Sequence, residues 1–431
     1  MIHALLERAG RRAESADACL KADETLTLLF ESGRLVSTAW SRERGVNLRV
    51  RAEGRVGSAG STGSSVEALV EAARAAAALG DRVDLLLPAP APLPSVRTAS
   101  PAAAAAGVAD LVHLGEGFFE RVARDGHEAR VVVERSVGGV RVANTRGVEA
   151  SYDVTGVTLS AEVTRGAGSA SLSAGDRYSA ADLPAESDLA ALAESILRRL
   201  RWAERTAECP RGELPVLFTP AAVAALLLPL RQACQGKAVF RRHSPLAGRL
   251  GEPAFDPRFT LTDDPWVPGA PGSRAVDDEG VPTRRVPLVR SGVVAGFIYE
   301  LETAALAGVP ATGHARRTTF GKPQAGYSNL VVSPGEATWA ELLAMIPDGL
   351  VVDALGGVGE GNVIGGAFSH PVALGWRVLG GEITGRVAGA TVAGNVYELL
   401  ADVGGIGREV ERRGSLATPA LLLQGVSVAP R

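Results

Sequence analysis

The spacing of apolar residues over the first 210 positions predicts a set of strands with a few amphipathic helices between them. Apolar and polar residues alternate in several short runs, and this period of two is typical of half-buried strands. The expected strands are Thr25–Glu31, Leu35–Ser41, Val46–Ala52, Val56–Ala59, Arg130–Arg135, Val140–Asn144, Ala150–Arg165 and Ser169–Ser173.

Helical spacing replaces this alternation in four segments of the same half. We expect helices over residues 1–19, from Ser64 to Leu79, at Ala102–Arg124 and at Asp188–Glu208. The second helix begins with capping-box spacing, Ser64 at the cap and Glu67 three residues later. The fourth is the clearest, because its apolar residues recur on one face: Leu189, Leu192, Ile196 and Leu200.

After the break Cys209-Pro210-Arg211-Gly212, the pattern becomes richer in strands and glycine. A helix is expected from Pro220, because proline suits a first helical turn. The other expected elements are strands at Leu214–Phe218, Ser328–Val332 and Ala420–Val428, hairpins at Val286–Arg290/Val293–Tyr299 and Trp376–Leu379/Glu382–Arg386, and helices at Glu300–Ala307, Thr338–Met345 and Asn395–Val403. The sequence therefore predicts an α+β fold with two domains, an N-terminal α+β domain (1–210) and a β-rich C-terminal domain (211–431).

Composition narrows the classes of protein. The 431 residues exceed what one hydrophobic core usually covers. The net charge of −3 provides no basic excess to neutralise phosphates, so we expect no nucleic-acid partner. No apolar run approaches the ~20 residues of a membrane span, and charges interrupt Met1 to Leu20, unlike a signal peptide. With three widely spaced cysteines and no disulfide framework, we expect a cytoplasmic protein.

A run of motifs in the second half resembles one family. It comprises Gly236, Ser244, Gly248, Gly251-Glu252, Asp263-Asp264-Pro265, Asp277–Thr283 and Thr312–Ala315. In this order they resemble the TldD/PmbA family, once called modulators of DNA gyrase, and best from Leu214 to Gly414. The run Thr312-Gly313-His314-Ala315 is similar to the TldE/PmbA branch rather than to the catalytic TldD branch.

The resemblance implies where a zinc site would lie. In the catalytic branch a helix carries His-Glu-x-x-x-His, which places two ligands and a general base toward one ion, and a cysteine near the C-terminus is the third ligand. Counting back from Gly236 places that motif at Leu227–Gln232. Leu227 and Leu228 stand at the first histidine and the glutamate, Gln232 at the second histidine, and Ser415 in the cysteine region. We therefore expect no metal ligands and no zinc at this place.

Other candidate sites are weaker. His127-Glu128 resembles half of a zinc motif, but an alternating run follows it, so a surface turn is expected. Gly356–Gly361 lacks the spacing of a nucleotide-binding loop. Asp263-Asp264 is interpreted as a solvated turn in preference to an acid/base pair. Thr312, Gly313 and His314 are the candidate residues for peptide contact, with a purely structural role for His314 equally open.

The resemblance implies a TldE/PmbA-like, zinc-free subunit that pairs with a TldD-like catalytic subunit, which holds the zinc. Such a pair cuts unfolded or small modified peptides, and this chain would supply a channel wall and the dimer interface. Two alternatives stay open: a self-sufficient homodimeric peptidase with an unrecognised site, and a non-enzymatic peptide-binding scaffold.

Overall fold

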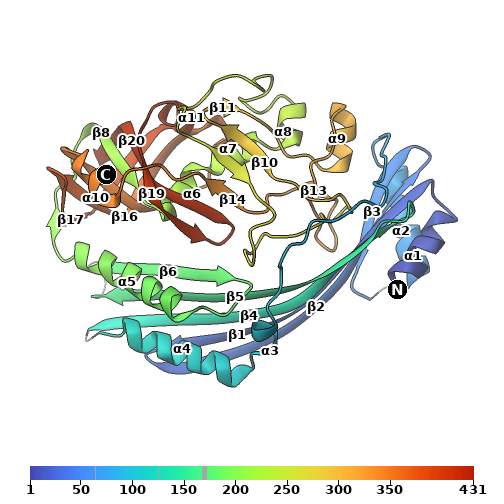
Figure 1. The fold of residues 1–431 in the computed structure, drawn as a ribbon, viewed down its shortest axis with the longest axis horizontal. Helices are drawn as coiled ribbons and strands as arrows, with labels where there is room; N and C mark the ends of the chain where they lie inside the picture. The colour runs from blue at the N-terminus through green and yellow to red at the C-terminus, as the bar shows by residue number, and fades with distance from the viewer. Residues whose placement is uncertain (64, 125, 167–171) are drawn as a thin grey trace.

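The computed structural model of the chain describes residues 1–63, 65–124, 126–166 and 172–431. It has two β-sheets with helices beside them, which confirms the predicted α+β class (Figure 1). The first sheet is antiparallel, with strand order β3-β2-β1-β4-β5-β6. Its strands are β1 (Ser15–Glu31), β2 (Arg34–Ala52), β3 (Arg55–Ser61), β4 (His127–Asn144), β5 (Glu149–Arg165) and β6 (Leu172–Ala180).

Five helices of the described residues accompany this sheet: α1 (Ile2–Gly10), α2 (Val66–Ala78), α3 (Pro101–Ala105), α4 (Val108–Val122) and α5 (Glu186–Trp202). Alternation along β1 points Leu26, Leu28 and Phe30 into the core that α4 covers. Gly115 of α4 is required there, since an added Cβ would lie 2.2 Å from the Phe30 ring. Helix α4 therefore sits directly on the sheet.

The second sheet is mixed and larger, with the main strand order β11-β10-β9-β14-β20-β8-β15-β16-β17-β7, while β18 pairs with β16 and β20, and β19 with β20. Its strands are β7 (Thr206–Ala207), β8 (Gly212–Phe218), β9 (Leu261–Asp263), β10 (Val286–Arg290), β11 (Val293–Val294), β14 (Leu330–Val332), β15 (Asp348–Leu355), β16 (Ala367–Leu379), β17 (Glu382–Val387), β18 (Ala390–Asn395), β19 (Val403–Arg413) and β20 (Leu416–Pro430). β12 (Ala315–Arg316) and β13 (Gln324–Ala325) form a separate pair.

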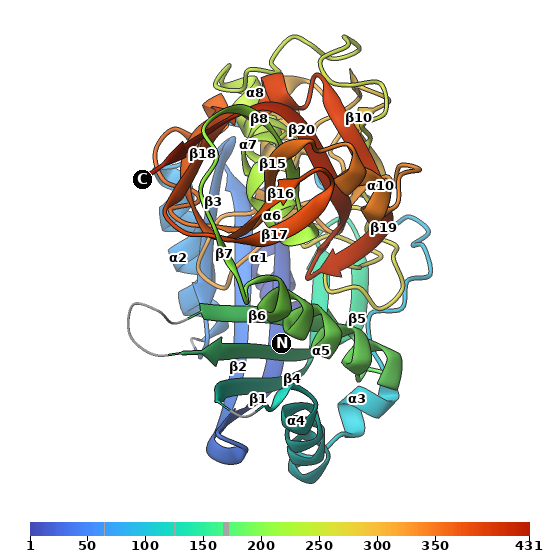
Figure 2. The same ribbon diagram turned by 90° about the vertical axis from the view of Figure 1, so that its left-hand side faces the viewer.

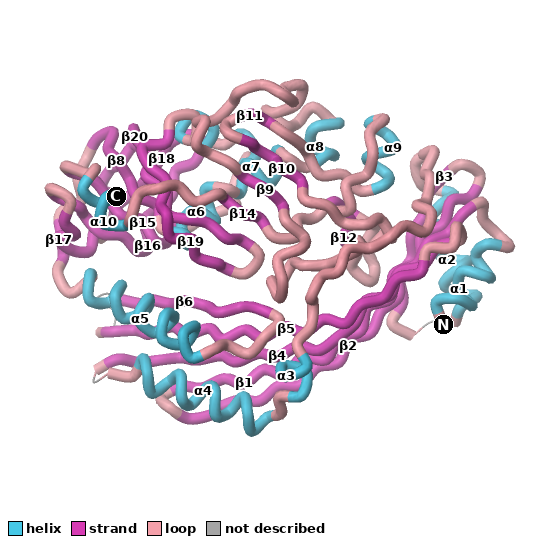
Figure 3. The backbone as a smooth tube through the Cα atoms, in the orientation of Figure 1, coloured by secondary structure: helices cyan, strands magenta, loops and turns pink. Residues whose placement is uncertain are grey.

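Short helices fill the space around the second sheet: α6 (Pro220–Leu226), α7 (Leu228–Ala233), α8 (Gly236–Phe240), α9 (Leu301–Ala307), α10 (Trp339–Ala344) and α11 (Val396–Leu399). Most of the chain between α8 and α9 is loop (Figure 3). No helix in the described ranges is both long enough and apolar enough to span a bilayer.

Several predicted boundaries are wrong, each for a local reason. The predicted Ala102–Arg124 helix breaks at Ala106, which is extended, and Asp110 then caps the N–H of Gly107. The predicted Asn395–Val403 helix keeps only α11, because Val403 already pairs with β20. Strand β11 keeps two of the residues predicted for Val293–Tyr299.

Three further predictions change. His127-Glu128 is the start of strand β4 and pairs with β5, so the predicted surface turn is wrong, and the strand runs unbroken through Gly138-Gly139. Ser65 caps α2, accepting a hydrogen bond from the Ala68 N–H, while the predicted cap Ser64 lies outside the described residues. So does Ser169, the predicted start of a strand that the structure describes from Leu172.

The two sheets meet through α5 and a shared apolar core (Figures 1 and 2). The predicted Asp188–Glu208 helix ends at Trp202, whose indole stacks on Trp339 at 5.8 Å and meets Trp376 edge-on at 5.3 Å. Thr206–Ala207 then pairs with β17, so the chain has joined the second sheet before Pro210. The boundary at 210 stays a prediction.

Candidate functional site

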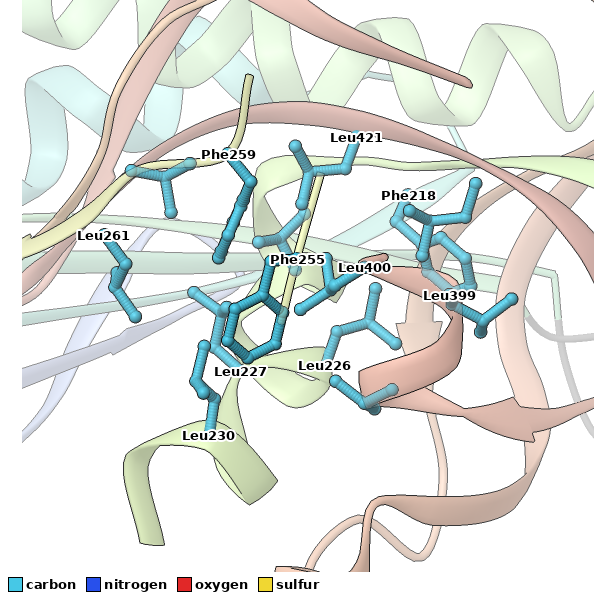
Figure 4. Packing of buried hydrophobic residues seen from close by; sticks show 14 of the residues in the cluster. Phe218, Leu226, Leu227, Leu230, Phe255, Phe259, Leu261, Leu399, Leu400 and Leu421 are labelled. Atoms are coloured by element: carbon cyan, nitrogen blue, oxygen red, sulfur yellow. The ribbon is translucent and has the colours of Figure 1, made fainter. Parts of the chain in front are cut away.

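The window Leu227–Gln232, where the catalytic motif would lie, is part of a packed core. Leu227 closes α6 and Leu228 opens α7, so the helix is broken at the first two motif positions, and Pro229 stands in the new first turn. The Leu227 and Leu230 side chains have no exposed surface. Figure 4 shows them among the neighbouring apolar side chains, including Phe255, Phe259 and Leu261.

These residues do not fit a zinc ion. Leucine has no donor atom, Gln232 is exposed at the far end of α7, and a glutamine amide is a poor ligand for this metal. Ser415 is exposed in the β19–β20 turn, where its carbonyl oxygen accepts the Leu330 N–H at 2.8 Å. Within the described part of the chain, no three His, Cys, Asp or Glu side chains are grouped so as to hold a metal ion.

The acidic signature Asp277–Thr283, which we call the signature loop, lies at the contact between the domains. Asp277 organises the loop itself: its carboxylate accepts the N–H groups of Glu279, Val281 and Ala315, each at 2.9 Å. Burial raises the pKa of Asp277, and the nearby Arg274 together with these N–H donors opposes the rise. The aspartate thus replaces water for three backbone groups.

The next two acidic residues reach into the first sheet. Asp278 accepts from Lys21 Nζ of β1 at 2.6 Å and from the Arg317 N–H at 2.7 Å. Glu279 accepts from Arg49 Nη1 of β2 at 2.5 Å and from the Leu301 N–H at 2.8 Å. Burial raises the pKa of Glu279, and the Arg49 guanidinium opposes that rise.

Arg49 also holds Asp17 of β1 through two hydrogen bonds of 2.8 and 3.1 Å. Asp17 in turn pairs with Arg317 from the second domain. Burial lowers the pKa of Arg317 to about 9. We call the set Asp17, Lys21, Arg49, Asp278, Glu279 and Arg317 the signature clamp. Apart from Lys21, its members are almost fully buried.

A second buried ionic set joins the domains at the other end of their contact. Arg199 of α5 lies 3.1 Å from Asp176 of β6 and 3.0 Å from Asp353 of β15. Arg413, at the end of β19, donates to Asp176 at 2.7 Å. Burial favours a higher pKa for Asp176, but Arg413, Arg199 and the Ser195 hydroxyl lower it below its ordinary value.

His314 is buried beside the signature loop. Its Nδ1 lies 2.9 Å from the Thr312 carbonyl oxygen and its Nε2 lies 2.8 Å from Asp263 Oδ2. Asp263 has no exposed surface and also accepts the Ser328 N–H at 2.8 Å, so its predicted place in a solvated turn is wrong. The peptide contact predicted for His314 finds no support in these contacts.

The two residues before His314 are held as tightly. Thr312 Oγ1 accepts the Tyr299 N–H at 2.8 Å. Gly313 has φ +76° and packs against the signature loop, where an added Cβ would lie 2.5 Å from the Pro282 carbonyl oxygen. Thr312-Gly313-His314 therefore connects the signature loop to Tyr299, just before α9, and to Asp263 of β9. Its peptide-binding role stays a prediction.

One cavity adjoins the motif window. It measures about 360 Å³ and is lined by Leu228, Pro229, Val358, Phe368, His370 and neighbouring residues. The glycine run Gly356–Gly361 forms part of its rim. His370 stacks on Phe368 with ring centroids 5.8 Å apart. Polar and apolar groups share the cavity lining about equally, and no metal-ligand group of the described residues lies there.

Comparison with known proteins decides the family. The model of the PmbA/TldA metallopeptidase C-terminal domain matches residues 211–430, and that of PmbA/TldA metallopeptidase domain 1 matches residues 16–80. The chain belongs to the PmbA/TldD family. The resemblance drawn from its motifs is confirmed.

Individual members are similar over part of their length. The chain is 28% identical over 193 residues to the metalloprotease TldD homolog of Haemophilus influenzae, covering 44% of this chain and 40% of that protein. It is 27% identical over 215 residues to the metalloprotease PmbA of Escherichia coli O157:H7, covering 50% and 45%. In these alignments the chain spans less than half the length of the curated relatives.

The fold matches over its whole length. Crystal structures of TldE from Thermococcus kodakarensis (22% identity, 99% of both chains) and of a putative modulator of DNA gyrase from Thermotoga maritima (23% identity, 100% of both chains) each superpose with a TM-score of 0.88. The two-domain arrangement is therefore that of the PmbA/TldD fold.

Sequence reasoning missed the signature clamp. It found the acidic loop but not its partners Asp17, Lys21 and Arg49 in the first strands, nor Arg317. The available signal was a charged residue inside a run of buried strand residues, Asp17 within Ala16–Leu20 of β1 and Arg49 within Gly45–Val50 of β2. Such an inward charge requires a partner of opposite sign from elsewhere in the fold.

Proposed function

We propose that this chain is the zinc-free, TldE/PmbA-type subunit of a cytoplasmic two-subunit peptidase. Its partner in this proposal is a TldD-like subunit that holds the zinc, and the substrate is an unfolded or small modified peptide. This chain contributes a wall of the peptide channel and the subunit interface, while the partner cleaves the peptide bond.

One observation carries the proposal: leucines stand at the first two motif positions, and the first of them, Leu227, is buried in the core. A zinc peptidase needs ligands and a general base that face a water-filled cleft. Here Leu227 and Leu230 contribute to the main core of the second domain, and the helix is broken between Leu227 and Leu228. This window therefore differs from the catalytic motif in its backbone and its packing as well as in its side chains.

The family membership supplies the kind of reaction, because related proteins are named as metalloproteases. The fold similarity to a protein titled TldE supports the choice of branch. Both supports concern the second domain and the complete fold, and neither identifies the peptide.

The proposal is tested with the purified full-length chain, alone and mixed with a TldD-like protein from the same cell. Elemental analysis should find no stoichiometric zinc in this chain, and a library of unstructured peptides should be cut only by the mixture. One tightly bound zinc per chain, or peptide cleavage by the pure chain, would overturn it. Capture of a non-protease partner in place of a TldD-like protein would favour the scaffold alternative.

A further inference from the structure

The first half of strand β2 is an uncovered sheet edge. β3 pairs with β2 only from Val46 onward, so residues 34–45 have β1 on one side and, in the described ranges, no strand on the other. Eleven consecutive residues, 34–44, are exposed, and we call them the edge segment. It belongs to the side of the sheet opposite β6 (Figures 1 and 2), and beyond its end, at Gly45 and Asn47, β2 contacts residues 319–321 of the second domain.

The edge segment carries exposed apolar side chains among polar and charged ones. Trp40 is 62% exposed, Val36 53% and Leu35 39%. A long edge with exposed apolar side chains is a template for pairing with another strand unless something protects it. The protecting charges stand at the two ends of the segment, Arg34 on one side and Arg42, Glu43 and Arg44 on the other, so residues 35–41 carry none. The Arg42 guanidinium lies 5.0 Å from the Trp40 ring and is paired with Glu24.

From this edge we infer that two copies of the chain pair through the edge segment, antiparallel and centred on Trp40, to form one continuous sheet. The inference concerns a contact between two copies of this chain and does not rest on the proposed catalytic partner. The partner is a second copy, because the charges of the edge segment allow one extended register of self-pairing and exclude the adjacent registers.

Symmetry limits the possible registers. In an antiparallel pair, residues directly opposite each other point to the same face of the sheet. A two-fold axis perpendicular to the sheet maps each face of the sheet onto itself. The axis therefore passes through a residue position, and that residue lies directly opposite the same residue of the second copy. Registers that pair at least nine of the eleven exposed residues are centred on Thr38, Ala39 or Trp40.

Charge then selects one register. Centring on Thr38 places Arg34 opposite the second copy's Arg42, and centring on Ala39 places Arg34 opposite Arg44. Like charges directly opposite destabilise a sheet. Centring on Trp40 places Arg42 opposite Thr38, Arg44 opposite Val36 and Glu43 opposite Ser37, so no like charges meet. The two indole rings then lie side by side, which is the cross-strand aromatic pairing that stabilises sheets.

The face on which the indoles meet also fits. Trp40 pairs with Leu26 of β1, and directly opposite residues share a face, so Trp40 lies on the side of the sheet that α4 covers. Pairing two copies would place the Trp40 pair and both Val36 side chains between the two α4 helices. The exposed apolar surface of the edge would thus be buried from both sides.

Cysteine cross-linking tests the register in the full-length chain. Trp40→Cys places the new thiol opposite its own copy, and Cα atoms of opposed residues are ~4.5–5.5 Å apart, within disulfide range. Under mild oxidation it should give a covalent dimer on a non-reducing gel. Thr38→Cys alone should not, because it faces Arg42. The wild-type chain, whose Cys19, Cys209 and Cys234 are free, is the background control.

A double variant tests the same register without removing the Trp40 side chain. Thr38→Cys with Arg42→Cys keeps Trp40 and should form two disulfides per dimer. The two new thiols of one copy cannot join, since four residues of strand span about 13 Å. Absence of cross-linking in both cysteine designs, with circular dichroism equal to wild type, would overturn the inference. So would a self-linked Thr38→Cys, or cross-linking of the segment to a different protein or to the peptide substrate.

Solution mass provides the second measurement. Light scattering should find a dimer for the wild-type chain. Val36→Lys should raise the dissociation constant of this dimer about tenfold, because the two-fold axis places a lysine opposite Arg44 at two positions. The matched control is Leu79→Lys, which changes an apolar side chain that is 92% exposed away from the edge. A monomeric wild-type chain, or equal effects of the two lysines, would contradict the pairing.

Discussion

The motif window and the signature loop are both family motifs of the second domain, and they differ in what surrounds them. The window Leu227–Gln232 exchanges polar ligand positions for leucines, and its central side chains lie in the main core. The signature loop keeps three acidic residues, all without exposed surface and all hydrogen-bonded across loops or domains. The acidic side chains of the signature loop and the central leucine side chains of the window are thus both buried.

The difference separates two kinds of evidence for function. Buried carboxylates with raised pKa values are often taken as signs of an active site. In the signature loop, burial raises the pKa values of Asp277 and Glu279, while Glu279 and Asp278 are paired with basic residues of β1 and β2. At the window, Leu227 and Leu228 have no side-chain atom that can bind a metal. The chemistry of the side chains therefore carries more weight than the persistence of a motif.

Glu279→Ala should have the largest effect on stability. It leaves Arg49 with one of its two buried carboxylate partners removed, and breaking a buried pair costs about 3–5 kcal/mol. The midpoint of chemical denaturation measures the loss. Glu409→Ala is the matched control, because its pair with Arg408 is 3.6 Å long and more than half exposed, and surface pairs contribute about 0–1 kcal/mol. Equal effects of the two variants would show that the clamp does not stabilise the fold.

Restoring the zinc motif should damage the fold without restoring the metal. Leu227→His places an imidazole in the core and Leu228→Glu a carboxyl group at a half-buried position, so we expect the triple variant with Gln232→His to lose about 2–5 kcal/mol and bind no zinc. Denaturation and elemental analysis measure the two outcomes. Gln232→His alone is the control, since this side chain is exposed and the change should be nearly neutral. Stoichiometric zinc in a stable triple variant would mean that the window can still open to a metal site.

These two regions also show which features could be predicted from the sequence alone. The leucines at Leu227 and Leu228 could be interpreted without coordinates, because the side chain itself excludes a ligand. The two-domain α+β class followed from the change of periodicity near Pro210. The partners of the signature loop could not be predicted, since Arg49 and Glu279 are 230 positions apart and only the folded sheet brings them together.

The errors in the predicted elements have a similar origin. The pattern of Asn395–Val403 is helical in spacing, but pairing of β19 with β20 takes Val403 into the sheet. Asp263 stands before a second aspartate and a proline, a sequence typical of turns. Its burial depends on His314 and Ser328, which lie far along the chain. Local patterns therefore gave the elements, and tertiary contacts moved their ends.

His314→Ala should have an intermediate effect. It removes the partner of Asp263 Oδ2 inside the core, and an unpaired buried acceptor costs about 1–3 kcal/mol. His370→Ala, at a half-buried ring beside the cavity, is the control for stability. Peptide affinity of the assembled peptidase provides the second measurement. A weaker peptide affinity at unchanged stability would favour the predicted role of His314 at the substrate, whereas lower stability at unchanged affinity would establish a structural one.

The smallest effect should appear at acid pH and separate the two buried ionic sets. The pKa of Asp176 is lower in the folded chain than its ordinary value, so ionised Asp176 stabilises the fold above the unfolded pKa of ~3.9. That stabilisation is lost as the pH falls through the lower folded value, because the unfolded chain binds the proton first. Burial raises the pKa of Glu279, which gives the opposite sign: that contribution falls as the pH rises above the ordinary glutamate value. Unfolding free energies measured below pH 4 should therefore fall less steeply for Asp176→Asn than for wild type, while Glu279→Gln should leave that acid slope unchanged. An unaltered acid slope in Asp176→Asn would mean that Arg199 and Arg413 do not lower the pKa of this carboxylate.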